Sequence, residues 1–371
     1  MIPVFEPIIG EDELQAVTAA LRSGEISGSF GETIPRFEQA FADYCECKYG
    51  VAVSSGTTAL HLAVAAAGIK HEDEVLVSSS TNIASALAIY HNGAVPVAVD
   101  SEEVTWNLNV DLIESLITSR TRGIIPVHLF GHPADMDRIV KIAERYKLTV
   151  IEDCAQSHGA KLNGKMTGSF GDMGCFSFYA NKIITTGEGG MVVTNDERLA
   201  ERLRLLRNLA FTKPRFKHEY AGYNFRMTGY QAAMGLAQFK KIDFFIAERR
   251  RVAHTYNHYL RDIPGLQLPT ELPGAFNVYW MYSIKVKPEF GMARDRLVEH
   301  LKCAGIDTRT FFYPINLQPC FQNTPGFKKI SNPVAERLWE TGLYLPSSAV
   351  LTEDTIIFIA NSIKRAQEQN S

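Results

Sequence analysis

A lysine and an aspartate follow two apolar segments of the kind that form buried strands. Lys182 ends residues 176–182 (FSFYANK), and Asp153 directly follows Ile151 and Glu152. Burial disfavours the charged form of a lysine, which makes its amine nucleophilic toward carbonyl groups. A carboxylate at the end of an apolar strand is costly unless it meets a cation. Either residue alone is more often structural, but together they indicate chemistry on a carbonyl compound.

A third segment is suited to a phosphate group. Residues 54–59 read SSGTTA and lead into a helix-length stretch. Gly56 lets the backbone approach a ligand, and we expect the amides of Gly56, Thr57 and Thr58 to be free donors at a helix N-terminus. Small residues before a helix are also common caps, so this segment alone is a weak signal. A phosphate cradle, an aspartate for a pyridinium nitrogen and a lysine for a Schiff base are together the parts of a pyridoxal phosphate enzyme.

The elements that must position these residues alternate regularly up to about residue 207. Strands are expected over residues 50–54, 74–77, 95–99, 123–127, 149–152, 175–178 and 191–194. Helices are expected over residues 57–67, 82–91, 110–118, 135–146 and 196–207. Several strands are apolar throughout, which predicts an α/β fold with a large, doubly wound, mostly parallel sheet. Ligands bind beyond the carboxyl ends of the strands in such sheets, where Asp153 and Lys182 stand.

The alternation of strands and helices ends before Thr228, which is expected to be the N-cap of one long or broken helical stretch over residues 229–260. A strand over residues 278–286, a helix over 293–304 and two closing helices, the last opening at residues 352–354, predict a smaller C-terminal α+β domain. We place the large domain at residues 1–245 and the small one at 246–371. The basic run at residues 249–251, with His254 and His258, is expected on a solvated helix face.

Composition excludes several classes of function. The chain has 371 residues and a net charge of −3, from 38 basic and 41 acidic residues, which argues against strongly electrostatic binding to nucleic acid or an anionic membrane. Six cysteines without a CxxC pair predict reduced, mostly buried thiols and no metal site. There is no GxGxxG fingerprint for a dinucleotide. No secretory signal or long apolar stretch occurs, so a cytoplasmic protein is expected.

The chain resembles the nucleotide-sugar aminotransferases of the DegT/StrS group, within the fold-type I superfamily of pyridoxal phosphate enzymes. The resemblance covers roughly residues 2–365 and rests on residues 55–60, 151–153, 177–182 with 185–190, and 222–228. Residues 126–129 and the Asn181-Lys182 pair look most similar to GDP-perosamine synthases. Those enzymes aminate C4 of a GDP-linked 4-keto-6-deoxy sugar with glutamate as donor. The resemblance thus implies this reaction, a role in lipopolysaccharide O-antigen biosynthesis, and a homodimer with active sites at the subunit interface.

The resemblance also implies roles for particular residues. Lys182 would form the Schiff base, Asp153 would pair with the pyridine nitrogen, and Gln156 would lie near the ring hydroxyl. The cofactor phosphate would be bound by residues of both subunits, namely Gly56, Thr57, Thr58, Ser177 and the neighbouring subunit's Asn224. Residues expected at the substrate are Ser27, His128, Arg226, Tyr313 and Asn316.

Three departures from the family pattern bear on the substrate. Asn82 stands at the cofactor where the family commonly has a stacking aromatic residue, Asn316 replaces a usual histidine, and Ser27-Gly28 lacks the usual preceding aromatic residue. Glu188 is expected to be structural in its glycine-rich turn. Lys182 favours transamination, because relatives with histidine at this place dehydrate sugars instead. A lyase of the same fold and a non-catalytic regulatory protein remain the alternatives.

Overall fold

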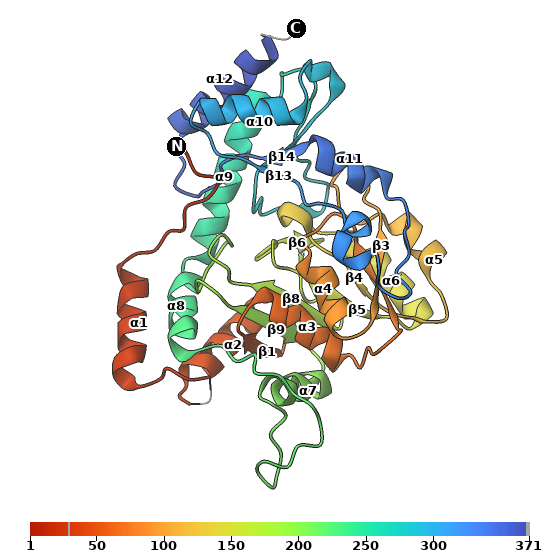
Figure 1. The fold of residues 1–371 in the computed structure, drawn as a ribbon. Coiled ribbons are helices and arrows are strands. Elements are labelled where there is room, and N and C mark those ends of the chain that lie inside the picture. The colour runs from red at the N-terminus through yellow and green to blue at the C-terminus, as the bar shows by residue number, and fades with distance from the viewer. Residues whose placement is uncertain (29, 369–371) are drawn as a thin grey trace.

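A seven-stranded sheet forms the centre of the computed structural model, which describes residues 1–28 and 30–368 (Figure 1). The strand order is β1-β9-β8-β5-β4-β2-β3. The strands are β1 (Tyr49–Val53), β2 (Glu74–Ser78), β3 (Val95–Val99), β4 (Thr121–Ile125), β5 (Thr149–Asp153), β8 (Met173–Ser177) and β9 (Gly190–Thr194). Strands β3, β2, β4, β5 and β8 run parallel to one another, whereas β9 is antiparallel to both β8 and β1. The predicted, mostly parallel sheet is confirmed.

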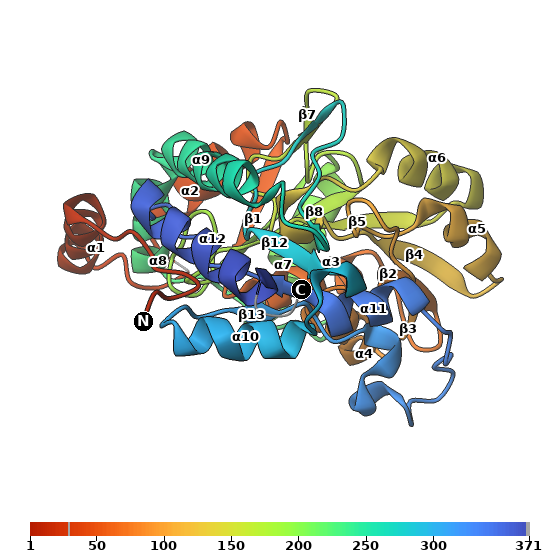
Figure 2. The same cartoon turned by 90° about the horizontal axis from the view of Figure 1, so that it is seen from above.

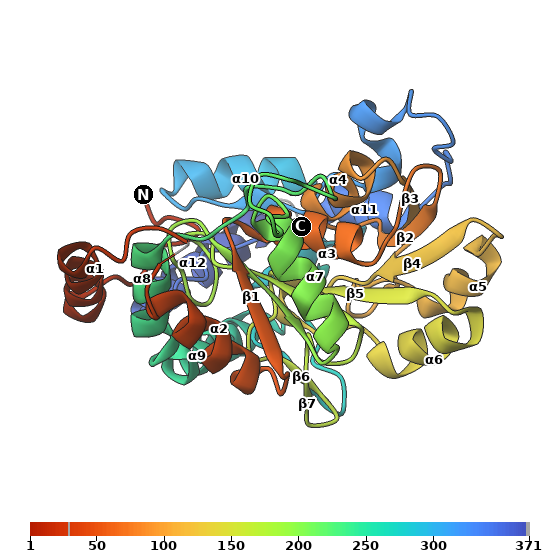
Figure 3. The ribbon, with the colours of Figure 1, turned by 90° about the horizontal axis from the view of Figure 1, so that it is seen from below.

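Helices cover both faces of this sheet (Figures 2 and 3). Successive side chains of a strand point to opposite faces, so Val51 and Val53 pack with one group of helices and Ala52 with the other. The first group is α3 (Gly56–Ala66), α4 (Ala84–His91) and α7 (Glu197–Arg207); the second includes α2 (Thr33–Tyr44) and α6 (Met136–Tyr146). The doubly wound arrangement is therefore confirmed.

A second, antiparallel sheet has the order β10-β12-β14-β13. Its strands are β10 (Leu266–Gln267), β12 (Ser283–Val286), β13 (Arg309–Thr310) and β14 (Gly342–Tyr344). It shares a core with α9 (Ile242–Leu260), α10 (Arg294–Cys303) and α12 (Glu353–Glu368). Because α9 also contributes Ile242 and Phe245 to the core under the large sheet, it joins the two. The predicted boundary after residue 245 falls within this helix and stays a prediction.

The remaining elements lie outside these two sheets. They are α1 (Glu11–Ser23), α5 (Ile113–Leu116), α8 (Gly229–Phe239), α11 (Pro333–Thr341) and a small sheet of β6 (Lys161–Leu162), β7 (Lys165–Met166) and β11 (Ala275–Phe276). Short 3₁₀ turns lie at Val110–Leu112, Leu129–Gly131, Pro288–Phe290, Ile315–Leu317 and Pro319–Phe321. Thr228 is the N-cap of α8, as expected, and its amide donates to Gln231 Oε1 at 3.0 Å. None of the helices in the described part of the chain is long and apolar enough to cross a membrane.

The strand predicted over residues 278–286 begins only at Ser283. Tyr279 has a φ of 46°, in the left-handed region that bulky side chains rarely adopt, and this breaks the extended chain. The Oδ1 atom of Asn277 accepts a hydrogen bond from the Tyr279 amide at 2.8 Å and supports the bend. The alternation of apolar and polar residues before Ser283 therefore belongs to a loop fixed by hydrogen bonds and not to a strand. All six cysteines are free, and four of them are buried.

Candidate active site

The carboxyl ends of β5 and β8 bring Asp153 and Lys182 into one cavity of about 360 Å³. The two strands are neighbours, and Asp153 pairs in register with Cys175 of β8. Lys182 follows in the loop between β8 and β9. Further predicted residues that line the same cavity are Gly56, Thr57, Asn82, Gln156 and Ser177. The structure thus gathers the core of the predicted site from four separate segments.

Asp153 is held as a buried carboxylate with two hydrogen bonds. Its Oδ2 atom accepts from Ser85 Oγ at 2.7 Å and its Oδ1 atom from the Ala155 amide at 3.1 Å, and the residue is 4% exposed. Burial lowers the pKa of Lys182 to about 8, while the negative charge of Asp153 acts in the opposite direction. About a tenth of the Lys182 amine is therefore the nucleophilic free base at pH 7, far more than for an ordinary lysine.

The N-terminus of α3 lies at the cavity, where the sequence predicts the phosphate cradle, but one of the predicted donors is not free. Ser55 is the N-cap, and the amide of Thr58 donates to Ser55 Oγ at 3.1 Å. Thr58 is therefore not a free donor, because its own cap satisfies it, and it is absent from the residues lining the cavity. A Cβ atom at Gly56 would lie 2.5 Å from Ser177 Cβ, so only glycine lets these two segments approach. The amides of Gly56 and Thr57 remain as the anion-binding end of the helix.

Gln156 and Asn82 are held in place differently. Gln156 is 2% exposed, and its Oε1 atom accepts from the Phe130 amide at 2.8 Å. Asn82 is exposed, and its Oδ1 atom accepts from the Ala84 amide at 3.0 Å at the start of α4. Asn82 thus lines the cavity with a polar side chain, at the place where the resemblance noted in the sequence leads us to expect an aromatic ring.

His128 lies beneath the site and not on its wall. It is fully buried, its Nδ1 atom accepts from the Ala134 amide at 3.0 Å, and its Nε2 atom lies 3.1 Å from Glu152 Oε2. Glu152 also accepts from the amides of Gly168, Phe170 and Gly171 at 2.7–2.8 Å. Both ring nitrogens of His128 are committed to the fold, which corrects its predicted place at the substrate.

Asn316 is also part of the framework. It is 4% exposed, and its side chain bonds with Ser79 Oγ at 3.2 Å, the Ile330 carbonyl at 3.0 Å and Glu336 Oε1 at 2.8 Å. It does not line the cavity, so its predicted contact with the substrate is corrected. Tyr313 lies outside the lining as well, about one third exposed, with its ring edge-on to Trp339.

Ser27, Arg226 and Asn224 do not line this cavity. A Cβ atom at Gly28 would touch Arg226 Cβ, so the Ser27-Gly28 segment packs on the loop after α7. Arg226 donates to Asn208 Oδ1, and Asn208 forms a β-bridge with Asn224. Asn224 itself is exposed. Its predicted contact with a neighbouring subunit's cofactor stays a prediction.

Sequence reasoning missed much of the cavity wall. The further lining residues are Ser55, Leu60, Ala84, Ala155, Tyr179, Asn181, Glu188, Trp280, Phe312 and Tyr344. The carbonyl of Glu188 accepts from Thr186 Oγ1 and Gln231 Nε2, in agreement with its expected structural role in the turn. Trp280, Phe312 and Tyr344 come from the C-terminal part of the chain. Of these three, only Phe312 adjoins a residue, Tyr313, that the sequence placed at the substrate.

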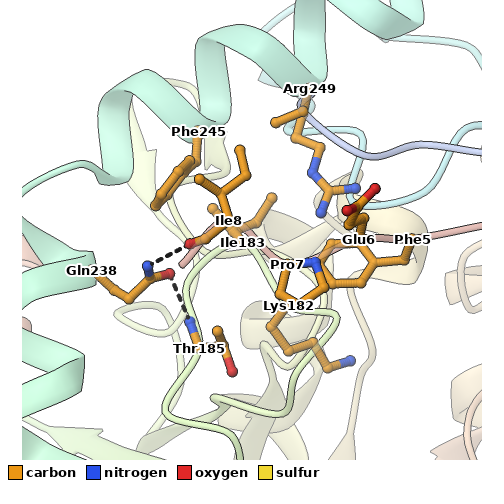
Figure 4. Close-up of a pocket in the computed structure, with 11 residues that line it drawn as sticks. Phe5, Glu6, Pro7, Ile8, Lys182, Ile183, Thr185, Gln238, Phe245 and Arg249 are labelled. Atoms are coloured by element: carbon orange, nitrogen blue, oxygen red, sulfur yellow. Dashed lines mark hydrogen bonds between the residues drawn. The ribbon is translucent and has the colours of Figure 1, made fainter. Parts of the chain in front are cut away.

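A second, small cavity adjoins Lys182 on the side of the N-terminal segment (Figure 4). Arg249 extends into it from α9 toward Phe5 and is 3% exposed. Its Nη1 atom donates to the carbonyls of Trp280, at 3.0 Å, and Ser347. The solvated face predicted for residues 249–251 is therefore wrong at Arg249, because main-chain carbonyls satisfy a guanidinium that the sequence pattern alone places in water. Burial lowers the pKa of Arg249 to about 9.

Comparison with known proteins gives consistent matches over the whole chain. Residues 7–364 match the model of the DegT/DnrJ/EryC1/StrS aminotransferase family. The chain is 42% identical over 363 residues to a GDP-perosamine synthase of Escherichia coli O157:H7, covering 98% of this chain and 97% of that protein. It is 37% identical over 373 residues to a dTDP-3-amino-3,4,6-trideoxy-alpha-D-glucose transaminase of Streptomyces venezuelae, covering 99% and 97%. The crystal structure of S. venezuelae DesV with a ketimine intermediate superposes with a TM-score of 0.89 at 37% identity, covering 96% and 94%.

Proposed function

Because the chain belongs to the DegT/DnrJ/EryC1/StrS aminotransferase family, we propose that it transfers the amino group of glutamate to a keto-sugar linked to a nucleoside diphosphate. It is a pyridoxal phosphate-dependent sugar aminotransferase. The observation that carries the proposal is the meeting of Lys182 and Asp153 in one cavity beside the α3 N-terminus. The likeness to a GDP-perosamine synthase supports C4 of a GDP-linked 4-keto-6-deoxyhexose as the position aminated.

The residues present fit this cofactor. The amides of Gly56 and Thr57 offer donors for its phosphate, and the approach of Ser177 to Gly56 closes the other side of that cradle. Asp153 provides a fixed negative charge for a protonated ring nitrogen, and Lys182 provides the amine that captures the aldehyde. When bound, pyridoxal phosphate supplies an electron sink for the negative charge that develops at carbon.

The chain's own residues then have distinct tasks. With the cofactor bound, Lys182 would hold it through Nζ before the reaction, and its freed amine would move a proton between the carbon of each substrate and the cofactor carbon. Asp153, fixed by Ser85 and the Ala155 amide, keeps the ring nitrogen protonated. Trp280, Phe312 and Tyr344 form the wall that excludes water from the reacting carbon.

Cofactor capture tests the lysine assignment. Reduction of the holoenzyme with borohydride should leave pyridoxal phosphate covalently attached to the wild-type chain and to Lys161→Ala, a matched variant whose lysine lines a different cavity. Lys182→Ala should retain no covalent cofactor. Attachment to Lys182→Ala, or a wild-type protein that gains no absorbance with added cofactor, would refute the assignment.

A substrate panel tests the reaction. Purified enzyme with glutamate should convert GDP-linked 4-keto-6-deoxy sugar to amino sugar, with formation of one 2-oxoglutarate per product. The dTDP-linked 3-keto sugar is the informative contrast, because a relative with that named activity is also 37% identical. Turnover of a keto-sugar without 2-oxoglutarate, and without conversion of the bound cofactor by glutamate alone, would instead identify a lyase.

A further inference from the structure

Trp280 lies against the reactive nitrogen of the site. The Nζ atom of Lys182 is 3.9 Å from the centre of the Trp280 ring, within the range in which a cation is attracted to an aromatic face. Trp280 is 3% exposed, so the contact is shielded from water, and such contacts are stronger when desolvated.

Two hydrogen bonds hold Trp280 in place, one at its indole and one at its main-chain carbonyl. Its Nε1 atom donates to the carbonyl of Asn181, the residue before Lys182, at 2.8 Å. The Trp280 carbonyl accepts from Arg249 at 3.0 Å, and the Arg249 guanidinium lies 4.9 Å above the ring of Phe5. Trp280 is therefore tied at one end to the lysine loop and at the other to α9 and the N-terminal segment.

The backbone before Trp280 is strained in a way that directs its side chain. Tyr279 adopts a left-handed φ of 46°, which an aromatic residue accepts only where the surrounding structure holds it. The Asn277 side chain and the Arg249 contact supply that support. Strain of this kind is commonly retained at functional sites.

We propose that Trp280 is a positioning residue for Lys182, whose amine rests on the indole face whenever it is not bonded to the cofactor. This inference rests on the proposed function, in which Lys182 must be released from the cofactor and still exchange protons with two substrates. Without a platform, a freed lysine side chain samples several rotamers; with it, Nζ stays beside the reacting carbon. The contact also favours the ammonium form over the free base.

Other titratable and charged groups surround Lys182. Those that line its two cavities or face it are Asp153, His158, Tyr179, Glu188, Tyr344, Glu6 and Arg249. Burial and the positive charge of Lys182 lower the pKa of His158 to about 3, so its ring stays neutral throughout the range of the test. Asp153 favours the ammonium, as Trp280 does, and burial opposes both.

The experiment measures protonation of Lys182 in two ways. In the full chain freed of cofactor, the rate of combination with pyridoxal phosphate is followed against pH, since only the free amine reacts. Trp280→Leu, which keeps an apolar side chain without a ring, should move the midpoint down by about half to one pH unit. Trp280→Phe, which keeps a weaker ring face, should move it by less, and the control Trp339→Leu should leave it unchanged.

The second readout needs no cofactor and no variant of Trp280. Tryptophan fluorescence of the wild-type chain should titrate with the same midpoint, and Lys182→Met should remove that transition. An unchanged or raised midpoint in Trp280→Leu, equal shifts in the leucine and phenylalanine variants, or a fluorescence transition that survives in Lys182→Met would each overturn the proposal. Failure of the chain to combine with pyridoxal phosphate at all would refute the proposed function instead, while the fluorescence titration would still decide the role of Trp280.

Discussion

Replacement of His128 by glutamine should destabilise the protein without affecting substrate binding. His128 bonds with the buried carboxylate of Glu152 at 3.1 Å and accepts from the Ala134 amide at 3.0 Å. Because Nδ1 accepts, the neutral ring carries its proton on Nε2 and donates it to Glu152. The variant His128→Gln cannot satisfy both partners at once, since its amide is shorter and differently shaped than the imidazole.

The size of the effect follows from these two contacts. A hydrogen bond to a charged group contributes about 1.5–3 kcal/mol, and a buried amide left without a partner costs about 1–3 kcal/mol. Since the two losses share one side chain and are not additive, we expect a decrease of about 3 kcal/mol in the free energy of unfolding. The Glu152 carboxylate keeps its three amide donors, which limits the damage.

The assay is equilibrium urea denaturation of the holoenzyme at fixed protein and cofactor concentrations, because both alter apparent stability. The control is His71→Gln, whose side chain is 82% exposed and should change stability by less than about 0.5 kcal/mol. The KM for the keto-sugar should stay within about twofold of wild type in both variants. A His128→Gln enzyme of wild-type stability with a KM raised about tenfold would refute this reasoning and return His128 to the substrate pocket.

Three further variants test other parts of the site. Gly56→Ala places a Cβ atom 2.5 Å from Ser177 Cβ. The dissociation constant of the cofactor, measured by equilibrium dialysis, should therefore rise by about tenfold or more. An unchanged constant would contradict the predicted phosphate cradle. Asp153→Asn removes the negative charge that favours the ammonium form of Lys182, so the pKa of Lys182 should fall below about 8. The rate of cofactor capture should then reach half its maximum at a lower pH than in the wild type. A shift to higher pH would be inconsistent with the pairing of Asp153 and Lys182. Asn316→Ala loses bonds to Ser79, Ile330 and Glu336 and should lower the free energy of unfolding by about 2–3 kcal/mol, with KM unchanged; an intact stability and a raised KM would restore Asn316 as a substrate residue.

The sequence predicted the large sheet well because local signals and tertiary structure agree there. Strand β3 was predicted to the residue, and the other six sheet strands within one or two residues at each end. Buried parallel strands read as apolar runs, and their carboxyl ends meet at one edge. Asp153 and Lys182 could therefore be paired from their positions after neighbouring strands.

The errors occurred where a side chain is satisfied by a distant segment. Arg249 can be buried because the carbonyls of Trp280 and Ser347 accept hydrogen bonds from it, and neither residue is close to it in sequence. Asn316 and His128 are likewise polar residues near a predicted site whose partners turned out to be framework groups. Trp280 was predicted to lie in a strand because no local sequence pattern indicates that Tyr279 adopts a left-handed backbone conformation.

The reacting groups and part of the cavity wall come from different parts of the chain, which bears on how such an enzyme could be redesigned. Asp153, Lys182 and the α3 N-terminus are borne by adjacent parts of one sheet, so the reacting groups keep their spacing regardless of what faces them. Phe312 and Tyr344, by contrast, belong to separate chain segments and line the wall of the cavity. Exchange of such wall segments between related enzymes should therefore change which sugar binds. Asp153, Lys182 and the α3 N-terminus would keep their arrangement. The same architecture makes the fold a natural starting point for libraries that vary the acceptor and keep the donor.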